Sequence, residues 1–594
     1  MKTHGCGELR PEHAGRDVVL AGWVNAHRDH GGVLFIDLRD ASGVVQVVCE
    51  AEDVAAVAHR VRDEWCVAVR GTVRARPEGT VNPKLPTGEI EVEATGLEVI
   101  SECPPLPFPI ADHVETEEVT RLRYRYLDLR RRPMLEAMRL RSRVREVIRQ
   151  YLGERGFIEV ETPALARATP EGSRDFLVPS RLQRGKFYAL AQSPQLYKQV
   201  LMVAGVERYY QLASCFRDED PRADRQYEHT ELDLEMSFVE QSDVMSLVEG
   251  LFVELYRDCL GVELAAPFER LAYDEAIARY GTDKPDLREA AGPAIAELSP
   301  VFAGTGFKAF SGVLEGGGAV RGLRVPGAGA DASRSFLDGL IERAKELGAK
   351  GLVWMRVLTD ELEAPIAKFL SPQELAGIRT ALGAEPGDLL LLAADEPVLA
   401  STVLGHLRVE LAHAGGRVRS VADPAEWRFV WIVDMPLFEW SDESGVWQTV
   451  GNPFYSPTPE TLQYLETDPA RVRSLQYDLV VNGLEQLSGS IRSHNPDVLA
   501  RVLRTGGATD AEIEARFGWF LEALRHGAPP HGGIGMGIDR ALMAMIGTSS
   551  LRDVIAFPKT QTGADPMTGA PAPVEPEQLR ELGLRIVGED RAEL

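Results

Sequence analysis

Two short segments of the chain place charged side chains where they could hold a nucleotide. Residues 216–219 read Phe-Arg-Asp-Glu, and on an extended segment Arg217 and Glu219 share a face, because strand side chains alternate. The Arg can grip a phosphate while the carboxylate accepts a hydrogen bond. Residues 535–540 read Gly-Met-Gly-Ile-Asp-Arg, in which glycine lets the backbone approach a ligand and planar Arg540 can lie on an aromatic base. Alone, an Arg-x-Glu strand is more often a solvated ion pair.

Together and in this order, the two segments resemble motifs 2 and 3 of the class II aminoacyl-tRNA synthetases. Residues 155–163, Arg-Gly-Phe-Ile-Glu-Val-Glu-Thr-Pro, resemble motif 1, which in that family builds the dimer interface. The resemblance implies a homodimeric ligase that uses ATP as substrate and Mg²⁺ as cofactor. It also implies an α+β multidomain fold with an antiparallel-sheet catalytic domain, in which Arg217 and Arg540 are the catalytic residues.

Residues 192–199, Gln-Ser-Pro-Gln-Leu-Tyr-Lys-Gln, indicate which amino acid is bound. With residues 168–176, they resemble the bacterial aspartyl-tRNA synthetases, and this resemblance covers essentially the whole chain. Lys198 and Arg492 can meet the side-chain carboxylate of aspartate, since an Arg fork binds a carboxylate bidentately. The residues implied to bind aspartate are Glu171, Ser193, Gln195, Lys198, Arg217, Asp233, Gly451, Asn452 and Arg492.

The same resemblance assigns residues to Mg²⁺ and to ATP. Mg²⁺ would be held by hard oxygen ligands from Asp478, Glu485 and Ser490. In the implied reaction, the aspartate carboxylate attacks the α-phosphate of ATP, and the terminal hydroxyl of tRNA then takes the aspartyl group. No side-chain nucleophile is needed, so positioning and charge stabilisation carry the rate. The residues implied to bind ATP are Arg217, Asp218, Glu219, Gln226, His229, Glu231, Glu485, Gly537, Ile538, Asp539 and Arg540.

The sequence departs from the family pattern in three places. Gly451 and Asn452 stand where the family usually has paired histidines, and His229 stands where a phenylalanine is expected to stack on adenine. Glu231 replaces a glutamine, and Leu487-Ser488-Gly489-Ser490 replaces a glycine run. A histidine can still stack and an asparagine can still donate a hydrogen bond, so an active enzyme is expected. A slow enzyme or a diverged paralogue remains the alternative.

Residues 1–104 alternate short β-like runs with turns. Five strands and one helix in this length suggest a small closed barrel, the OB-fold, whose strand face binds oligonucleotides. A small barrel with another role is the alternative. The strands are expected at residues 18–24, 32–40, 43–49, 66–74 and 89–94, and the helix at 51–64.

Several barrel residues match positions that read the anticodon in the family. Phe35 and Gln46 match those that stack on and read its central U; Arg28, Arg76, Asn82 and Glu93 match other anticodon-facing positions. His30 and Gly79 resemble the residues of non-discriminating members, which charge both tRNA-Asp and tRNA-Asn with aspartate. An amidotransferase would then convert Asp-tRNA-Asn into Asn-tRNA-Asn. The alternative is a solvent-facing His and an ordinary turn Gly.

The remaining organisation follows from breaks in composition. The Pro-rich segment 104–109 marks a linker. A Gly- and Ala-rich region separates motifs 2 and 3, with a helical pattern at 334–347 and a βα-like pattern at 389–413, so it predicts an inserted α/β domain. The predicted domains are 1–104 (anticodon-binding barrel), 105–134 (hinge), 135–286 and 425–558 (catalytic), 287–424 (insertion) and 559–594 (C-terminal extension).

The composition limits the class of protein. A chain of 594 residues with 44% hydrophobic and 26% charged residues is globular and too long for one core. The six cysteines form no C-x-x-C pair, so neither a disulfide framework nor a zinc site is indicated. The start lacks an apolar signal region, and we expect a cytoplasmic protein without membrane partners. The net charge of −25 argues against nucleic acid, but residues 120–149 form an Arg-rich island that could steer a polyanion; a charged linker is the alternative.

Four rival functions are the alternatives. A lysyl-tRNA synthetase would need acidic groups facing the side chain, in place of Lys198 and Arg492; an asparaginyl-tRNA synthetase is the other near rival. An ammonia-dependent asparagine synthetase should lack the barrel. A non-catalytic tRNA-binding paralogue would lose Arg217, Glu219 or Arg540, and all three are present.

Overall fold

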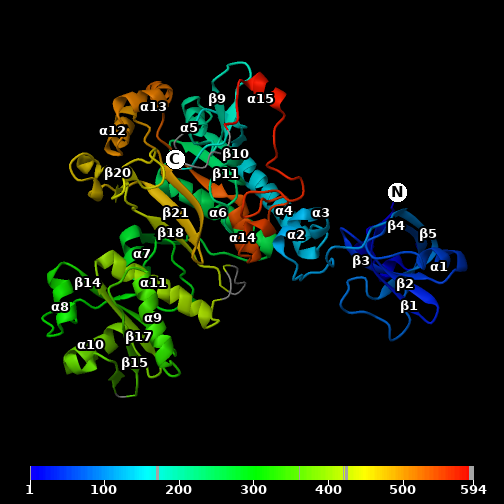
Figure 1. The fold of residues 1–594 in the computed structure, drawn as a ribbon, viewed down its shortest axis with the longest axis horizontal. Coiled ribbons are helices and arrows are strands. Elements are labelled where there is room, and N and C mark those ends of the chain that lie inside the picture. The colour runs from blue at the N-terminus through cyan, green and yellow to red at the C-terminus, as the bar shows by residue number, and fades with distance from the viewer. Residues whose placement is uncertain (1, 169–172, 360, 419–420, 422–425, 588–594) are drawn as a thin grey trace. The chain divides into compact units, whose positions relative to one another are not determined.

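The chain folds into two compact units, seen in the ribbon of Figure 1. The first comprises Met1–Glu136 with Asp565–Thr568, and the second Ala137–Ala564 with Gly569–Leu594. Among the described residues, none of the helices combines the length and the apolar character needed to span a bilayer. The computed structural model describes residues 2–168, 173–359, 361–418, 421 and 426–587.

The first unit contains a closed barrel of five strands in the order β1-β2-β3-β5-β4. Side chains alternate across its wall: Leu34, Ile36 and Leu38 point into the barrel core and are buried, whereas Phe35 is partly exposed. The predicted small barrel is therefore confirmed. Its elements are β1 (Asp17–His30), β2 (Val33–Asp40), β3 (Gly43–Cys49), α1 (Glu52–Ala58), β4 (Cys66–Ala75) and β5 (Ile90–Ser101).

The Arg-rich segment after the barrel folds into two short helices, α2 (Glu118–Arg123) and α3 (Arg125–Asp128). Its arginines converge on the fully buried carboxylate of Asp128, which lies 2.6 Å from Arg125, 2.7 Å from Arg131 and 3.5 Å from Arg121. A buried carboxylate needs such partners. Arg121, Arg125 and Arg131 therefore serve an internal ion-pair network.

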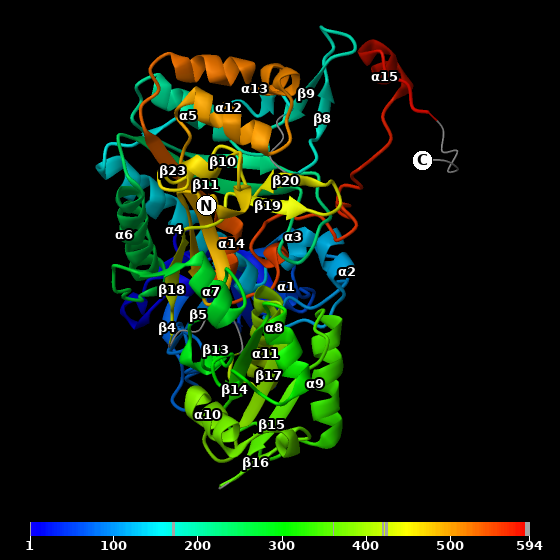
Figure 2. The same cartoon turned by 90° about the vertical axis from the view of Figure 1, so that its left-hand side faces the viewer.

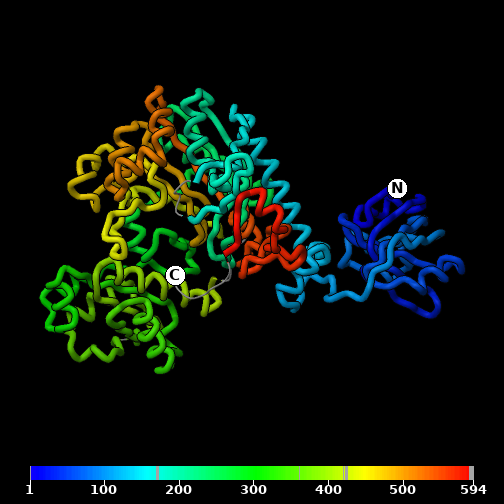
Figure 3. Tube along the Cα trace, turned by 45° about the horizontal axis from the view of Figure 1, so that its top comes forward, coloured from blue at the N-terminus to red at the C-terminus, as the bar shows by residue number. Residues whose placement is uncertain are grey.

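The second unit is built on an eight-stranded, mainly antiparallel sheet. Strand β11 pairs with β10 on one side and with β23 on the other, so it lies between the strands that lead into the two predicted nucleotide-binding segments, which are far apart in the sequence. Figure 3 traces the Cα path of the chain. The strand order is β12 (Glu269–Ala272), β18 (Phe429–Val433), β21 (Gln476–Val481), β22 (Leu484–Ile491), β23 (His531–Gly537), β11 (Glu228–Ser237), β10 (Arg208–Phe216) and β6 (Ile158–Glu159).

One face of this sheet packs against long helices. The core there joins Val144 and Ile148 of α4 (Arg132–Glu154), Phe252 of α6 (Gln241–Leu260), and Leu232 and Leu234 of β11. Residues 231, 233 and 235 of β11 alternate with these leucines and point to the opposite face. That face carries α5 (Gln195–Val203), and α14 (Ile538–Ile546) begins at the end of β23.

A separate sheet, with helices on both of its faces, lies in the sequence between β12 and β18 (Figure 2). Its five strands are ordered β13-β14-β17-β15-β16. The apolar run in β17 serves both faces: Leu389 and Leu391 pack under α9 and α11, while Leu390 and Leu392 pack under α8 and α10. The elements are β13 (Ala296–Glu297), α8 (Lys308–Glu315), β14 (Ala319–Val325), α9 (Arg334–Glu346), β15 (Val353–Val357), β16 (Leu362–Glu363), α10 (Pro372–Leu382), β17 (Leu389–Asp395) and α11 (Pro397–Ala414).

The remaining elements of the second unit surround the sheet. Two small sheets are present, β7-β9-β8 and β19-β20. Helices α12 and α13 pack together in a separate cluster that also includes Leu196 and Phe454. Their bounds are β7 (Leu165–Ala166), β8 (Leu177–Pro179), β9 (Phe187–Leu190), α7 (Tyr273–Tyr280), β19 (Phe438–Ser441), β20 (Val446–Thr449), α12 (Pro496–Thr505), α13 (Asp510–Arg525) and α15 (Pro576–Leu582).

Candidate functional site

A cavity of about 560 Å³ lies over the sheet of the second unit, on the face turned away from α4 and α6. Strands β11, β21, β22 and β23, helix α5 and the start of α14 supply most of its walls. Most residues predicted to bind aspartate, ATP or Mg²⁺ meet there. Those that line the cavity are Ser193, Gln195, Lys198, Arg217, Glu219, Gln226, His229, Glu231, Asp233, Gly451, Asn452, Asp478, Glu485, Arg492, Gly537, Asp539 and Arg540.

Two buried cations mark one end of the cavity. The ammonium of Lys198 lies 2.7 Å from Asp233 Oδ1 and 3.0 Å from the carbonyl oxygen of Ile534. Arg492 holds Glu235 with both Nε and Nη2, at 2.9 and 3.1 Å, and donates from Nη1 to Ser490 Oγ. Both cations have more N–H donors than these contacts with described residues use. They can therefore accept a further carboxylate.

Glycines in β23 make room for the carboxylates above it. Asp233 of β11 pairs with Gly535, and Glu235 pairs with Gly533. A Cβ atom at Gly533 would collide with the Glu235 carboxylate, and one at Gly535 with that of Glu231. The Gly-rich sequence of the strand is thus required by close approach.

Five buried polar atoms of residues that line the cavity have no hydrogen-bond partner among the described residues. They are Gln195 Nε2, Gln226 Nε2, Asp233 Oδ2, Gln476 Oε1 and Gln486 Oε1. Buried polar atoms are otherwise nearly always paired, because an unpaired one costs about 1–3 kcal/mol. Their convergence on one cavity indicates a polar ligand with both donors and acceptors.

The other end of the cavity carries the two predicted nucleotide-binding arginines. Arg217 lies just beyond β10, with Nη2 3.6 Å from Glu231 Oε2 and about one third of its side chain exposed. Arg540, in the first turn of α14, has Nη1 3.7 Å from Glu485 Oε1. Glu219 is held by Ser173, whose hydroxyl donates to it, and by Arg225 at 2.9 Å. The charges around this end suit a polyphosphate.

Asp478 and Glu485 form a pair of carboxylates suited to a divalent cation. Burial, together with the charge of Glu485, raises the pKa of the Asp478 carboxyl to about 7. Carboxylates that oppose one another's ionisation are stabilised by a shared cation, and hard oxygen ligands suit Mg²⁺. Lys284 already lies 3.1 Å from Glu485 Oε2 and was not anticipated from the sequence.

The third predicted Mg²⁺ ligand, Ser490, is placed elsewhere than expected. Its hydroxyl accepts from Arg492, and it does not line the cavity. Ser488 instead lies directly opposite Asp478 in the β21–β22 register and lines the cavity. A register shift between Leu479 and Val480 brings Glu485 and Ser488 to the same face despite their odd spacing.

Other predicted ATP-binding residues have structural partners. Asp218 pairs with Arg174 outside the cavity lining, and Ile538 is fully buried. Asp539 accepts from the backbone N–H of Thr230 at 2.8 Å and from Arg141 of α4. Asp539 therefore fixes α14, and with it Arg540, against β11. Glu171 lies outside the described residues.

Most positions that depart from the family pattern line the cavity, with Gly489 and Ser490 excepted. Gly451 has φ of 70°, the left-handed region that favours glycine, and Asn452 Oδ1 accepts from the N–H of Phe454 at 2.9 Å. His229 Nε2 lies 3.7 Å from Glu231 Oε2. Burial opposes ionisation of Glu231, yet His229 and Arg217 hold the pKa of its carboxyl at about 2.

The predicted anticodon residues lie on the barrel. Arg28 and Phe35 are register partners on β1 and β2, and Arg28 pairs with Asp37 at 2.7 Å. Gln46 donates to Glu91 at 2.9 Å, which fixes the direction of its amide. The others have local contacts: Arg76 Nε donates to the Ile90 carbonyl, Asn82 Oδ1 accepts from the Lys84 N–H, and Glu93 pairs with Arg74.

His30 and Gly79 lie at two loops of the same barrel. His30 ends β1 and its ring contacts Phe35 edge-on, with the ring centroids 6.0 Å apart. Gly79 has φ of 82°, and a Cβ there would meet nothing within 4 Å. Both positions thus have space around them.

The sequence reasoning missed the supports of this site. Glu235 is fully buried and holds Arg492, and Arg141 holds Asp539. The alternation of Glu231, Asp233 and Glu235 along β11 was a signal that could have revealed Glu235. No local pattern marks Arg141, because its partner is far away in the sequence.

Comparison with protein families gives two matches. Residues 117–561 match the model described as tRNA synthetases class II (D, K and N), and residues 18–100 match an OB-fold nucleic acid binding domain. Among curated proteins, the chain is 52% identical to an aspartate–tRNA(Asp/Asn) ligase of Moorella thermoacetica, over 98% of this chain and 96% of that protein. It is 50% identical to a protein of the same name from Thermobifida fusca, over 99% of each chain.

Solved structures share the fold at lower identity. The asparaginyl-tRNA synthetase of Pyrococcus horikoshii complexed with asparaginyl-adenylate has a TM-score of 0.60 and 20% identity, covering 94% of this chain and 98% of that one. The aspartyl-tRNA synthetase of Entamoeba histolytica has a TM-score of 0.56 and 20% identity, covering 94% and 91%. At such identities the likeness shows the fold alone.

Proposed function

Because the chain belongs to the class II tRNA synthetases (D, K and N), we propose that its cavity activates L-aspartate with ATP and charges tRNA-Asp and tRNA-Asn with the product. The observation that carries the choice of aspartate is the pair of buried cations, Lys198 and Arg492, at one end of the cavity. A carboxylate that binds between the two cations loses its hydration water and accepts hydrogen bonds from charged donors in its place. The names of the curated relatives point the same way.

In this proposal each end of the cavity holds one part of the adenylate. Lys198 and Arg492 bind the side-chain carboxylate, and Asp233 Oδ2 accepts from the substrate ammonium. Arg217 neutralises the α-carboxylate and α-phosphate while the carboxylate oxygen attacks phosphorus and pyrophosphate leaves. Arg540 and His229 cover the adenine. The chain supplies positioning and charge, and no covalent intermediate with the enzyme forms.

Asp478, Glu485 and Ser488 would hold Mg²⁺, which supplies charge stabilisation for the phosphates when bound. Ser488 replaces Ser490 in this set because it faces Asp478 across the strands. Lys284 already contacts one oxygen of Glu485, and Arg540 contacts the other. The Glu485 carboxylate therefore pairs with a cationic side chain through each of its oxygens.

A lysine substrate fits this cavity poorly. Its ammonium would lie beside Lys198 and Arg492, and like charges in a buried site repel strongly. Asparagine is a closer rival because its amide oxygen can accept a hydrogen bond. It lacks the negative charge that two buried cations favour, so aspartate is preferred.

We expect ATP–pyrophosphate exchange to depend on aspartate and to need no tRNA. Measured separately with each of the twenty amino acids, exchange with aspartate should exceed that with asparagine or lysine by about 10³-fold or more, since polar and charged contacts discriminate strongly in buried sites. Exchange with asparagine or lysine but not aspartate would overturn the assignment.

The barrel supports binding of the tRNA anticodon. Phe35 offers a partly exposed ring for stacking, and Gln46 presents a fixed amide beside it. Stacking contributes about 1–3 kcal/mol per base. Acceptance of tRNA-Asn rests on the space around His30 and Gly79, and the product would need an amidotransferase to become Asn-tRNA-Asn. We place the enzyme in the cytoplasm, where its tRNA substrates would be used.

The domain boundaries are proposed with these roles. Residues 1–104 bind the anticodon, 105–134 act as a hinge, and 135–286 with 425–558 form the catalytic domain. Residues 287–424 are an insertion, and 559–594 are a C-terminal extension. The closed barrel, the eight-stranded sheet and the separate five-stranded sheet support this division.

We propose a C₂ homodimer through the segment that resembles motif 1. Its strand β6 is the edge of the large sheet, and Ile158 on that strand is 52% exposed. An exposed apolar edge favours pairing with another chain. Light scattering at micromolar concentration should give twice the chain mass; a monomer mass would contradict the dimer.

A further inference from the structure

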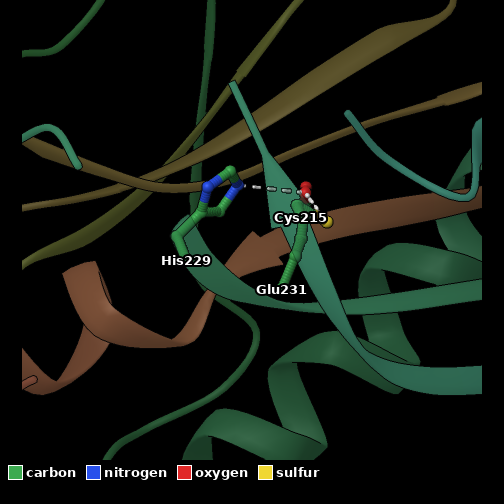
Figure 4. A group of neighbouring side chains, drawn as sticks. All are labelled: Cys215, His229 and Glu231. Atoms are coloured by element: carbon green, nitrogen blue, oxygen red, sulfur yellow. Dashed lines mark hydrogen bonds and ion pairs between the residues drawn. The ribbon is translucent and has the colours of Figure 1, made fainter. Parts of the chain in front are cut away.

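Three side chains of different chemistry converge beside the cavity (Figure 4): Cys215, which is buried, and His229 and Glu231, which line the cavity. The pairing of β10 with β11 brings them together, because Cys215 is the register partner of His229. Glu231 lies two residues further on the same face of β11, opposite the small side chain of Ala213. The thiol, the imidazole and the carboxylate are therefore fixed by sheet geometry.

The distances among the three donor atoms suit a single metal ion. Glu231 Oε2 lies 3.6 Å from Cys215 Sγ and 3.7 Å from His229 Nε2, and all three donors lie within 4.8 Å of one another. Tetrahedral Zn²⁺ with bonds of about 2.0–2.3 Å holds its ligand atoms about 3.3–3.6 Å apart. Small side-chain shifts would thus complete the coordination.

We propose that Cys215, His229 and Glu231 bind Zn²⁺, or a transition metal of similar preference, with a fourth position open to the cavity. A mixed sulfur, nitrogen and oxygen set selects such a metal over Mg²⁺. The thiolate and the carboxylate together neutralise the two charges of the ion. Burial raises the pKa of the Cys215 thiol, so the metal displaces the thiol proton, which passes to the buffer.

The metal would oppose nucleotide binding, and this part rests on the proposed function. Arg217 Nη2 lies 3.6 Å from the same Glu231 Oε2 that would become a ligand. A bound dication takes this carboxylate from the guanidinium and repels it. Arg217 would then leave the position from which it meets the α-phosphate. The site is thus an inhibitory metal site within the catalytic cavity.

The site is tested by titrating the metal-free, full-length protein with Co²⁺. We expect one Co²⁺ per chain, a sulfur-to-cobalt charge-transfer band in the near ultraviolet, and loss of the band on addition of one equivalent of Zn²⁺. Cys215→Ala should abolish the band, whereas the control Cys259→Ala, which changes a partly buried cysteine of the same unit, should keep it. Absence of the band in the wild type, or its persistence in Cys215→Ala, would overturn the site.

A second variant guards against misfolding of Cys215→Ala, which circular dichroism would reveal. His229→Phe keeps the thiol and removes one ligand, so it should weaken Co²⁺ binding by at least about tenfold. Unchanged affinity in this variant would exclude His229 and overturn the three-ligand site.

The inhibitory role is tested by ATP binding with and without one equivalent of Zn²⁺. Zinc should weaken ATP binding to the wild type by at least about tenfold and leave that of Cys215→Ala nearly unchanged; complexation of Zn²⁺ by ATP itself affects both equally. Equal effects in the two proteins would overturn the inhibition. If the metal-free wild type bound no ATP, the proposed function would fail while the cobalt spectrum still decided the metal site.

Discussion

Replacement of Arg217 by Ala is expected to lower aspartate-dependent pyrophosphate exchange by about 10³-fold. The structure places this guanidinium in the cavity, between the carboxylate of Glu231 and the carbonyl of Gln192. Charge develops there as pyrophosphate leaves, and a positioned cation that stabilises such charge is worth about 10²–10⁵ in rate. A thousandfold loss corresponds to about 4 kcal/mol.

Two further variants make this expectation specific. Arg217→Lys should recover only part of the activity, because an ammonium cannot reproduce the planar fork. Arg222→Ala is the matched control: this arginine is exposed on the same loop and does not line the cavity, so exchange should stay near that of the wild type. If Arg217→Ala kept more than a tenth of the activity, Arg217 would not stabilise the transition state.

The local pattern of apolar and polar residues made much of the fold predictable. The outward Phe35 between inward Leu34 and Ile36 follows from a barrel strand buried on one face. The run Leu389–Leu392 is uninterrupted because its strand is covered by helices on both faces, which is the pattern of a buried α/β sheet. In both regions, the pattern of apolar residues over a few neighbouring positions was enough to predict the strand and which of its faces are buried.

The features that the sequence did not predict depend on contacts between residues that are not close to one another in the chain. Ser488 faces Asp478 because of a bulge whose register only the paired strands determine. The arginines near residue 125 were interpreted as a basic surface, yet three of them, Arg121, Arg125 and Arg131, pair with one buried aspartate, Asp128. In each case the residue type was recognised and its partner was not.

The proposed metal site of Cys215, His229 and Glu231 could not be predicted from the sequence for a similar reason. Cysteine spacing gave no sign of a zinc site, because the only signal was one cysteine followed, fourteen residues later, by His-x-Glu. The antiparallel pairing of β10 and β11 puts Cys215 directly opposite His229. Ligands that meet across a sheet leave no fixed spacing in the sequence, whereas those within one loop do.

Relaxed choice of tRNA is the consequence expected from the barrel. The two tRNAs differ at the third anticodon letter, and the family resemblance places His30 and Gly79 on the loops that flank it. The structure leaves space at both positions: His30 is exposed at the end of β1, and nothing lies within 4 Å of a Cβ at Gly79. A loosely packed neighbourhood discriminates poorly, because no contact is lost with the wrong base.

The purified enzyme should therefore aspartylate tRNA-Asn within about tenfold of tRNA-Asp, a difference of about 1.4 kcal/mol in kcat/KM. His30→Leu combined with Gly79→Lys should widen the gap to about a hundredfold, mainly by slowing tRNA-Asn, while exchange without tRNA stays unchanged. Because residue 79 has a left-handed φ, Gly79→Asn is the control for backbone strain, since Asn tolerates this conformation and adds no long side chain. Rejection of tRNA-Asn by about a thousandfold in the wild type would mean that the space at these two loops does not relax the choice of tRNA.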